Sequence, residues 1–279
     1  MPLNNLAIRS ITGFFFATII ISSCFAPIFW QICLYCLLMV LGLREFISFF
    51  KKDSTIQIDS VSAYFLQILI YTIISCTYFF EINTNLLWVL IPIIFTVLLN
   101  ELWRNVGQPL LNISALLFGV GYTLVPFLLI IRLGNLSEQQ FMNFPLVLGM
   151  YLMIWTNDTF AYLSGSFFGK HPLFPRISPK KTWEGTIGGV LITILVSLIL
   201  TWSTGELSIT FWLVSALIIA PAAILGDLLE SLFKRGANVK DSGILFPGHG
   251  GVLDRFDAVI FTVPFYYFWS WFYLEYIVL

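Results

Sequence analysis

Long apolar runs, separated by short polar segments, follow one another along the whole chain. They lie near residues 8–24, 27–43, 60–79, 86–100, 110–131, 144–168, 186–203, 208–226 and 258–277. A helix needs about 20 mainly apolar residues to cross the hydrocarbon core of a bilayer. The pattern therefore predicts an all-α polytopic membrane protein with about nine transmembrane helices. The fourth run is short, so we expect it to tilt or to include flanking aromatic residues.

Composition supports a bilayer as the solvent of this chain. Hydrophobic residues make up 58% of the 279 positions and charged residues only 10%, whereas a soluble domain carries about 25% charged residues. We expect no separate soluble domain and no nucleic-acid partner. Cys33-x-x-Cys36 has a redox or metal spacing, but it lies inside a span without His or carboxylate neighbours, so packing is the favoured interpretation.

The basic residues gather on one side of the predicted membrane. With nine spans, all of the 14 Lys and Arg residues except Arg132 fall on the side that holds the N-terminus. The positive-inside rule then predicts a cytoplasmic N-terminus and a non-cytoplasmic C-terminus. We divide the chain into N-terminal transmembrane helices, 1–143, and a catalytic region, 144–279, with site loops 170–185 and 227–257.

The segment that follows the eighth apolar run has a polar face with helical periodicity. Asp227, Glu230, Ser231 and Lys234 share that face, and the positions between them are apolar. An interfacial amphipathic helix is one interpretation. Asp227 argues against it, because this carboxylate sits where the span is still ending and needs a partner or a metal ion.

A glycine-rich loop and two further carboxylates come next. The loop contains Lys240-Asp241-Ser-Gly243 and Pro247-Gly248-His249-Gly250-Gly251. Glycines allow φ > 0 and close approach of the backbone, so successive N–H groups can converge on an anion, although a flexible loop is the alternative. Asp254 and Asp257 are three apart on one helical face. Together with Asp227 they offer the ligands for one or two divalent cations, and Mg²⁺ suits this supply.

Two other polar groups stand out in the apolar chain. The first is Ser178-Pro-Lys180-Lys181-Thr182-x-Glu184, which opens a predicted helix on the basic side. A helix N-terminus with adjacent lysines binds phosphate well, although a loop that only sets topology is the alternative. The second is Asn157-Asp158 inside the sixth span, where a carboxylate is a proton relay, a structural pair or part of the site.

These segments resemble the phosphatidate cytidylyltransferase, or CDP-diacylglycerol synthase, family. The family pattern of Ser-x-apolar-Lys-Arg, Lys-Asp-x-small and Pro-x-His-Gly-Gly-apolar-x-Asp-Arg-apolar-Asp is matched from Ser231 to Asp257. Asn157-Asp158 and the segment from Ser178 to Gly185 are also similar to the family. The resemblance is specific over about 157–258, and before that it rests on hydrophobicity.

The resemblance implies that CTP and phosphatidate react to give CDP-diacylglycerol and pyrophosphate, with Mg²⁺ as cofactor. It implies Asp227 and Asp254 as metal ligands, a second, monovalent cation such as K⁺, and a homodimer in the inner or cytoplasmic membrane. We place Lys240 and Asp241 with these carboxylates as catalytic candidates, Asp257 as a further metal ligand, and the cavity on the cytoplasmic side. The substrate-binding candidates are Asn157, Asp158, Ser178, Lys180, Lys181, Thr182, Lys234, Arg235, His249, Gly250, Gly251 and Arg255.

Two other functions use similar residues. A transporter or channel for an anion also needs intramembrane charges, but it predicts polar residues on both sides and two related halves. In this sequence the polar groups lie almost all on one side and no repeat appears. A lipid or polyprenol kinase that uses CTP shares the substrate types.

Overall fold

The structure is a computed structural model that describes residues 5–50, 55–80, 82–139, 144–246, 248 and 250–277. Over these residues the chain forms nine α-helices, one short 3₁₀-helix and one two-stranded sheet. Their bounds are α1 Asn5–Cys24, α2 Ile28–Ser48, α3 Ser60–Phe79, η1 Thr84–Val89, α4 Leu90–Arg104, α5 Pro109–Gln139, α6 Leu146–Phe168, β1 Pro172–Phe174, β2 Ser178–Thr182, α7 Trp183–Thr204, α8 Ile209–Gly236 and α9 Leu253–Tyr276.

Each predicted apolar run coincides with one α-helix, so the all-α membrane architecture is confirmed. In the described part of the chain, six helical segments are long and apolar enough to cross a membrane: α2, α3, η1 with α4, α5, α7 and α8. The apolar part of α1 is shorter, and α6 and α9 carry more Tyr, Trp and polar residues. The count of nine spans therefore stays a prediction.

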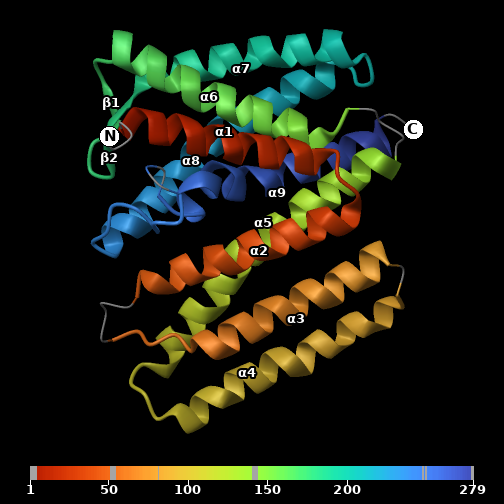
Figure 1. Cartoon of the computed structure of the whole chain (residues 1–279), viewed down its shortest axis with the longest axis vertical. Helices are drawn as coiled ribbons and strands as arrows, with labels where there is room; N and C mark the ends of the chain where they lie inside the picture. Colours follow the sequence, from red (N-terminus) through yellow and green to blue (C-terminus); the bar gives the residue numbers. More distant parts are fainter. Residues whose placement is uncertain are drawn as a thin grey trace.

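The helices run back and forth in one elongated bundle (Figure 1). The α3–α4 hairpin forms one edge, α6 and α7 form the other, and the long α5 crosses the middle. The main core is built from aromatic and aliphatic side chains of α2, α5, α6, α8 and α9, with Phe127, Tyr151, Trp212 and Phe256 fully buried. This core holds the C-terminal helices against α2 and α5.

Two local features differ from the expectations. The helix α8 continues to Gly236, well past the predicted end of its apolar run at residue 226, so the polar face of 227–234 belongs to this same helix. An antiparallel hairpin stands in the loop before α7, with Pro172 opposite Thr182 and Phe174 opposite Ser178. The hairpin lies at the end of the bundle where α8 ends and α9 begins (Figure 1).

Candidate active site

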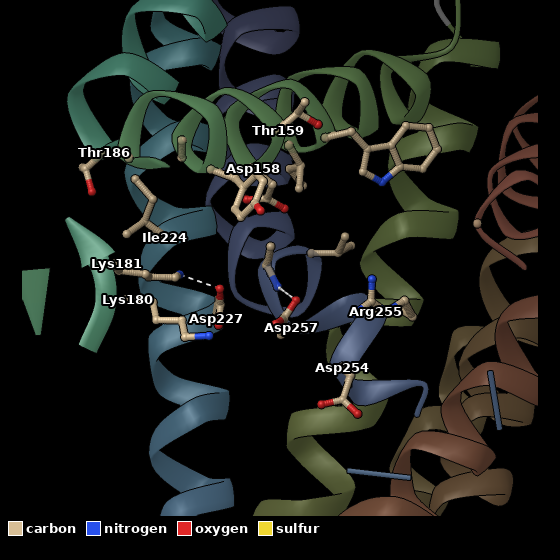
Figure 2. Close-up of a pocket in the computed structure, with 18 of the residues that line it drawn as sticks. Asp158, Thr159, Lys180, Lys181, Thr186, Ile224, Asp227, Asp254, Arg255 and Asp257 are labelled. Atoms are coloured by element: carbon tan, nitrogen blue, oxygen red, sulfur yellow. Dashed lines mark hydrogen bonds and ion pairs between the residues drawn. The ribbon is translucent and has the colours of Figure 1, made fainter. Parts of the chain in front are cut away.

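A cavity of about 920 Å³ opens between α1, α6, α8, α9 and the hairpin. Part of its lining is apolar, including Phe16, Ile154, Trp155 and Phe246. Another part is strongly polar (Figure 2). Its polar lining includes Asp158, Thr159, Lys180, Lys181, Thr182, Asp227, Asp254, Arg255 and Asp257.

The hairpin carries two lysines to this cavity. The Nζ of Lys181 lies 2.5 Å from Oδ2 of Asp227, and Lys180 is exposed beside it, with no salt bridge to a described residue. The hydroxyl of Thr182 accepts a hydrogen bond of 3.2 Å from the N–H of Gly185. It therefore caps α7, because a side-chain oxygen at this position satisfies an N–H group that has no partner within the helix. The lysines thus lie directly before a capped helix.

A second contact fixes the hairpin to the first turn of α7. One oxygen of Glu184 accepts hydrogen bonds from the N–H groups of Lys170 (3.1 Å) and His171 (3.2 Å). The other oxygen lies 2.5 Å from Nδ1 of His171. A carboxylate is favourable here because the helix dipole places partial positive charge at the N-terminus. Glu184, which follows β2, therefore binds the residues directly before β1 and holds the two ends of the hairpin together.

Three carboxylates from three helices face the cavity: Asp158 of α6, Asp227 of α8 and Asp257 of α9 (Figure 2). Asp257 accepts a hydrogen bond of 2.7 Å from the N–H of Ala258. Among the described residues, no three carboxylate, His or Cys side chains are close enough to hold a metal ion by themselves. Magnesium usually takes one or two carboxylates and completes its shell with phosphate oxygens and water. The donor set therefore fits Mg²⁺ bound jointly with a phosphate ligand.

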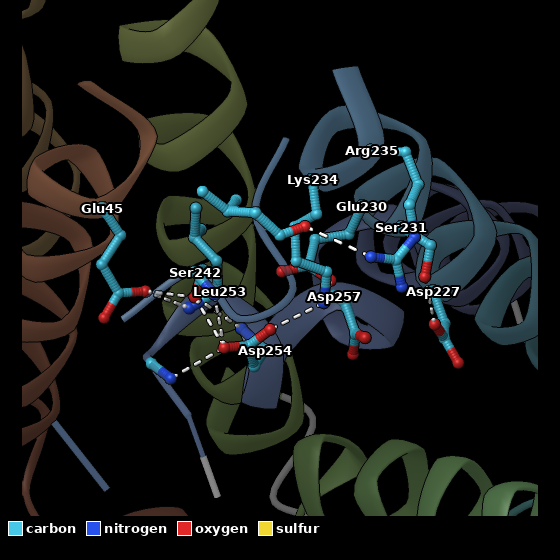
Figure 3. Close-up of polar contacts among 12 residues, drawn as sticks. Glu45, Asp227, Glu230, Ser231, Lys234, Arg235, Ser242, Leu253, Asp254 and Asp257 are labelled. Atoms are coloured by element: carbon cyan, nitrogen blue, oxygen red, sulfur yellow. Dashed lines mark hydrogen bonds and ion pairs between the residues drawn. The ribbon is translucent and has the colours of Figure 1, made fainter. Parts of the chain in front are cut away.

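Asp254 has a different environment from the other three carboxylates (Figure 3). Its Oδ1 lies 2.7 Å from Nζ of Lys234. Its Oδ2 accepts hydrogen bonds from the N–H and the hydroxyl of Ser242, at 2.8 and 2.9 Å, and from the N–H of Gly251 at 2.8 Å. Lys234 also forms an ion pair with the fully buried Glu230. Asp254 therefore organises the loop before α9 while it touches the cavity.

A residue that sequence reasoning missed completes this network. Glu45 of α2 is buried, and its oxygens accept hydrogen bonds from the N–H groups of Val252 and Leu253 and from the hydroxyl of Ser242, at 2.8, 2.9 and 2.8 Å. The available signal was a carboxylate that directly follows an apolar run on the side of the glycine loop. Nothing in one sequence pairs it with a loop more than 200 residues away.

The glycines of this loop make room for carboxylates of the protein itself. A Cβ at Gly251 or Gly243 would overlap the carboxylate of Glu45. A Cβ at Gly250, whose φ is +81°, would overlap that of Asp254. We expected the loop to converge on an external anion. Its N–H groups do converge on anions, but in the described residues these are Glu45 and Asp254.

The structure separates the remaining candidates from the cavity lining. Asn157 is fully buried against Gly189 of α7, and neither polar atom of its amide has a hydrogen-bond partner among the described residues. Lys234 is buried in its two ion pairs. His249 lies outside the described residues. The other candidates that do not line the cavity are Ser178, Arg235, Lys240, Asp241, Gly250 and Gly251.

The fold and this site define a multi-helix membrane protein with a charged cavity suited to phosphates. The chain belongs to the cytidylyltransferase family, whose profile matches residues 7–273. It is similar to the phosphatidate cytidylyltransferase of Haemophilus influenzae, with 39% identity over 160 residues that cover 54% of this chain and 56% of the relative. The enzymes of the same name from Staphylococcus epidermidis and Staphylococcus aureus are 47% and 46% identical over 120 residues, or 42% of this chain and 46% of each relative. The chain thus spans about half the length of the curated relatives that it matches.

Proposed function

We propose that the chain transfers the cytidylyl group of CTP to phosphatidate, giving CDP-diacylglycerol and pyrophosphate for phospholipid biosynthesis. The observation that carries the proposal is the cavity, where carboxylates of three helices face Lys180, Lys181 and Arg255. Its apolar wall suits a lipid and its charged wall suits phosphates. Membership of the cytidylyltransferase family and the names of the relatives support it.

In this reaction a phosphate oxygen of phosphatidate attacks the α-phosphorus of CTP. A new P–O bond forms, and the bond between the α-phosphorus and its bridging oxygen to the β-phosphate breaks. The electron pair leaves with pyrophosphate. The attacking phosphate is already ionised near neutral pH, so no strong general base is needed. The protein must bring two polyanions together and stabilise charge on the leaving group.

The cavity offers groups for both tasks. Lys180, Lys181 and Arg255 bind phosphates, and Lys181 also keeps the carboxylate of Asp227 oriented when substrate is absent. Asp227 and Asp257 would hold Mg²⁺, which would supply charge neutralisation of the phosphates. Asp254 also lines the cavity, but its carboxylate is paired with Lys234. The family resemblance further implies a second, monovalent cation such as K⁺.

We extend the proposal to location and assembly. The protein resides in the cytoplasmic membrane, with its N-terminus and the cavity facing the cytoplasm and its C-terminus on the other side. The distribution of Lys and Arg supports this, and α1 begins and α9 ends at opposite ends of the bundle (Figure 1). Reporters fused after Leu279 and inserted near Lys180 should therefore report opposite faces. The resemblance also supports a homodimer, which cross-linking in membranes would test.

One assay with purified protein distinguishes the candidate functions. CTP labelled with ³²P at the α- or the γ-phosphate is supplied with phosphatidate and Mg²⁺. We expect the α-label in lipid and the γ-label in pyrophosphate. Transfer of the γ-label to lipid would establish a kinase instead. Uptake of an anion into vesicles without any consumption of CTP would establish a transporter.

A further inference from the structure

The first turn of α9 carries three residues of the cavity: Asp254, Arg255 and Asp257. The position of this turn is not set by α9 alone. The α9 helix has no side-chain cap from its own N-cap residue, Val252. The first N–H groups of a helix have no partner within it. Here the N–H groups of Val252 and Leu253 donate to Glu45, a residue of α2.

We propose that Glu45 is a positioning residue for the transfer reaction: it fixes the start of α9 so that Arg255 and Asp257 face the cavity. This inference rests on the proposed function. Glu45 itself does not line the cavity and acts through the helix that it caps.

The packing around Glu45 shows a site built for one carboxylate. The side chain is buried, and five hydrogen-bond donors from Ser242, Gly251, Val252 and Leu253 meet Glu45 or its neighbour Asp254 (Figure 3). Gly243 and Gly251 leave the space that its oxygens occupy, because any Cβ there would overlap them. The partial positive charge at the start of α9 adds to the attraction. An ionised carboxylate is therefore matched in charge, shape and donors.

A chain of contacts carries this position to the cavity. The hydroxyl of Ser242 lies 2.8 Å from Oε2 of Glu45 and 2.9 Å from Oδ2 of Asp254. Asp254 continues the chain to Lys234 of α8, at 2.7 Å. Glu45 thus connects α2 with both helices that supply metal and phosphate ligands. If the charge of Glu45 is lost, its hydrogen bonds with Ser242 of the loop and with Val252 and Leu253 at the start of α9 are weakened.

The test compares Glu45→Gln with Glu101→Gln in the full-length protein. Glu101 of α4 is also a largely buried carboxylate, paired with Arg104 and Asn112, but it does not line the cavity and has no hydrogen bond or ion pair with the described residues of the loop. Amide hydrogen exchange of the segment 242–256, kcat/KM for CTP and the melting temperature are measured for both. In Glu45→Gln we expect the exchange rate of this segment to rise by about tenfold or more. We expect kcat/KM to fall by about tenfold or more. Glu101→Gln should change only the melting temperature.

A second variant covers the case in which Glu45→Gln does not fold. Gly251→Ala keeps the glutamate at position 45, but its added methyl group displaces the carboxylate of Glu45 from the loop. Its kinetic defect should match that of Glu45→Gln, and the double variant should be no worse than the poorer single variant. Additive defects would overturn the proposal, as would unchanged exchange of 242–256 or an increase spread over all helices. If the wild type fails to consume CTP, the proposed reaction fails, while the exchange data still decide whether Glu45 orders α9.

Discussion

Two polar clusters differ in whether their charges are paired within the protein. The elements that carry them, the hairpin with the start of α9 and the start of α3 with the end of α4, lie at the same end of the bundle (Figure 1). One is the cavity between α6, α8, α9 and the hairpin. The other, which we term the α3–α5 cluster, contains Asp59, Ser62, Asn100, Glu101, Arg104 and Asn112. Both place carboxylates next to apolar helices, where an unpaired charge is costly.

Internal pairing distinguishes the two. In the α3–α5 cluster, Asp59 accepts from Ser62 and Asn100, and Glu101 lies 2.6 Å from Arg104 and accepts from Asn112. The space beside it is about 10 Å³, too little for a substrate. Each carboxylate of that cluster thus has two partners. The cavity has about 920 Å³, and of its carboxylates Asp158, Asp227 and Asp257 only Asp227 has an ion pair with a described residue. Polar residues near a bilayer therefore indicate a site only when charge and volume remain for a ligand.

The largest expected effect is that of Asp254→Asn. The amide cannot accept from all the donors around Oδ2. The substitution also removes the negative charge that pairs with Lys234. We expect turnover at saturating Mg²⁺ to fall by about 10²–10³-fold, together with a lower melting temperature. Asp59→Asn is the matched control in the α3–α5 cluster and should keep its turnover. Near-normal product formation by Asp254→Asn would remove this residue from the site.

Asp257→Asn should separate activity from stability. The structure gives this carboxylate one hydrogen bond, from the N–H of Ala258, and an amide oxygen can accept it equally well. We therefore expect kcat/KM to fall by about a hundredfold with little change in melting temperature. The Mg²⁺ dependence of the rate is the measurement. A variant with an unchanged Mg²⁺ requirement and rate would show that Asp257 is not a metal ligand.

Lys180→Ala and Lys181→Ala should each lower kcat/KM by about ten- to a hundredfold. Each removes a charge-assisted phosphate contact of about 1.5–3 kcal/mol. Lys181→Ala also leaves Asp227 without its ion pair, so it should alter the Mg²⁺ dependence more than Lys180→Ala does. If the pair only sets topology, both single variants should keep normal kinetics, because many other basic residues remain on the predicted cytoplasmic side.

The smallest effect on activity belongs to Glu101→Gln. Loss of the charge weakens the contacts to Arg104 and Asn112. We expect a loss of about 1–3 kcal/mol in the free energy of unfolding, measured as thermal or denaturant stability in detergent. The value of kcat/KM per folded molecule should stay that of the wild type. A kinetic defect here would contradict the distinction between the two clusters.

Hydropathy was sufficient to predict where the helices lie, because apolar length is what a bilayer demands of a helix. It placed the end of the eighth apolar run at residue 226. The helical periodicity of 227–234 indicated a helix there, but not that this polar segment continues α8 to Gly236 as one helix. The β1–β2 hairpin was missed because its strands have only three and five residues and each contains a proline, Pro172 and Pro179, which argues against a strand.

The candidate site was predictable where residues act within their own segment. Asp227 and Asp257 reach the cavity from helices that local periodicity indicated. Lys180 and Lys181 were expected at the start of the next helix and reach the cavity from the hairpin directly before it. Glycine spacing correctly indicated that another group lies close to the backbone of the loop, but it did not indicate which group. That partner is Glu45, and only the packed fold brings α2 to the start of α9. Contacts between distant segments are what local patterns leave undetermined.

The contact between α2 and α9 has a consequence for synthesis. Glu45 and Val252 are 207 positions apart. At 5–20 residues per second, a ribosome needs about 10–40 s to make the chain between them. During that time the N–H groups of Val252 and Leu253 are not yet there to donate to Glu45, so its carboxylate must stay at the aqueous edge of the membrane. The start of α9 is therefore the element that draws this carboxylate into the protein and completes the cavity.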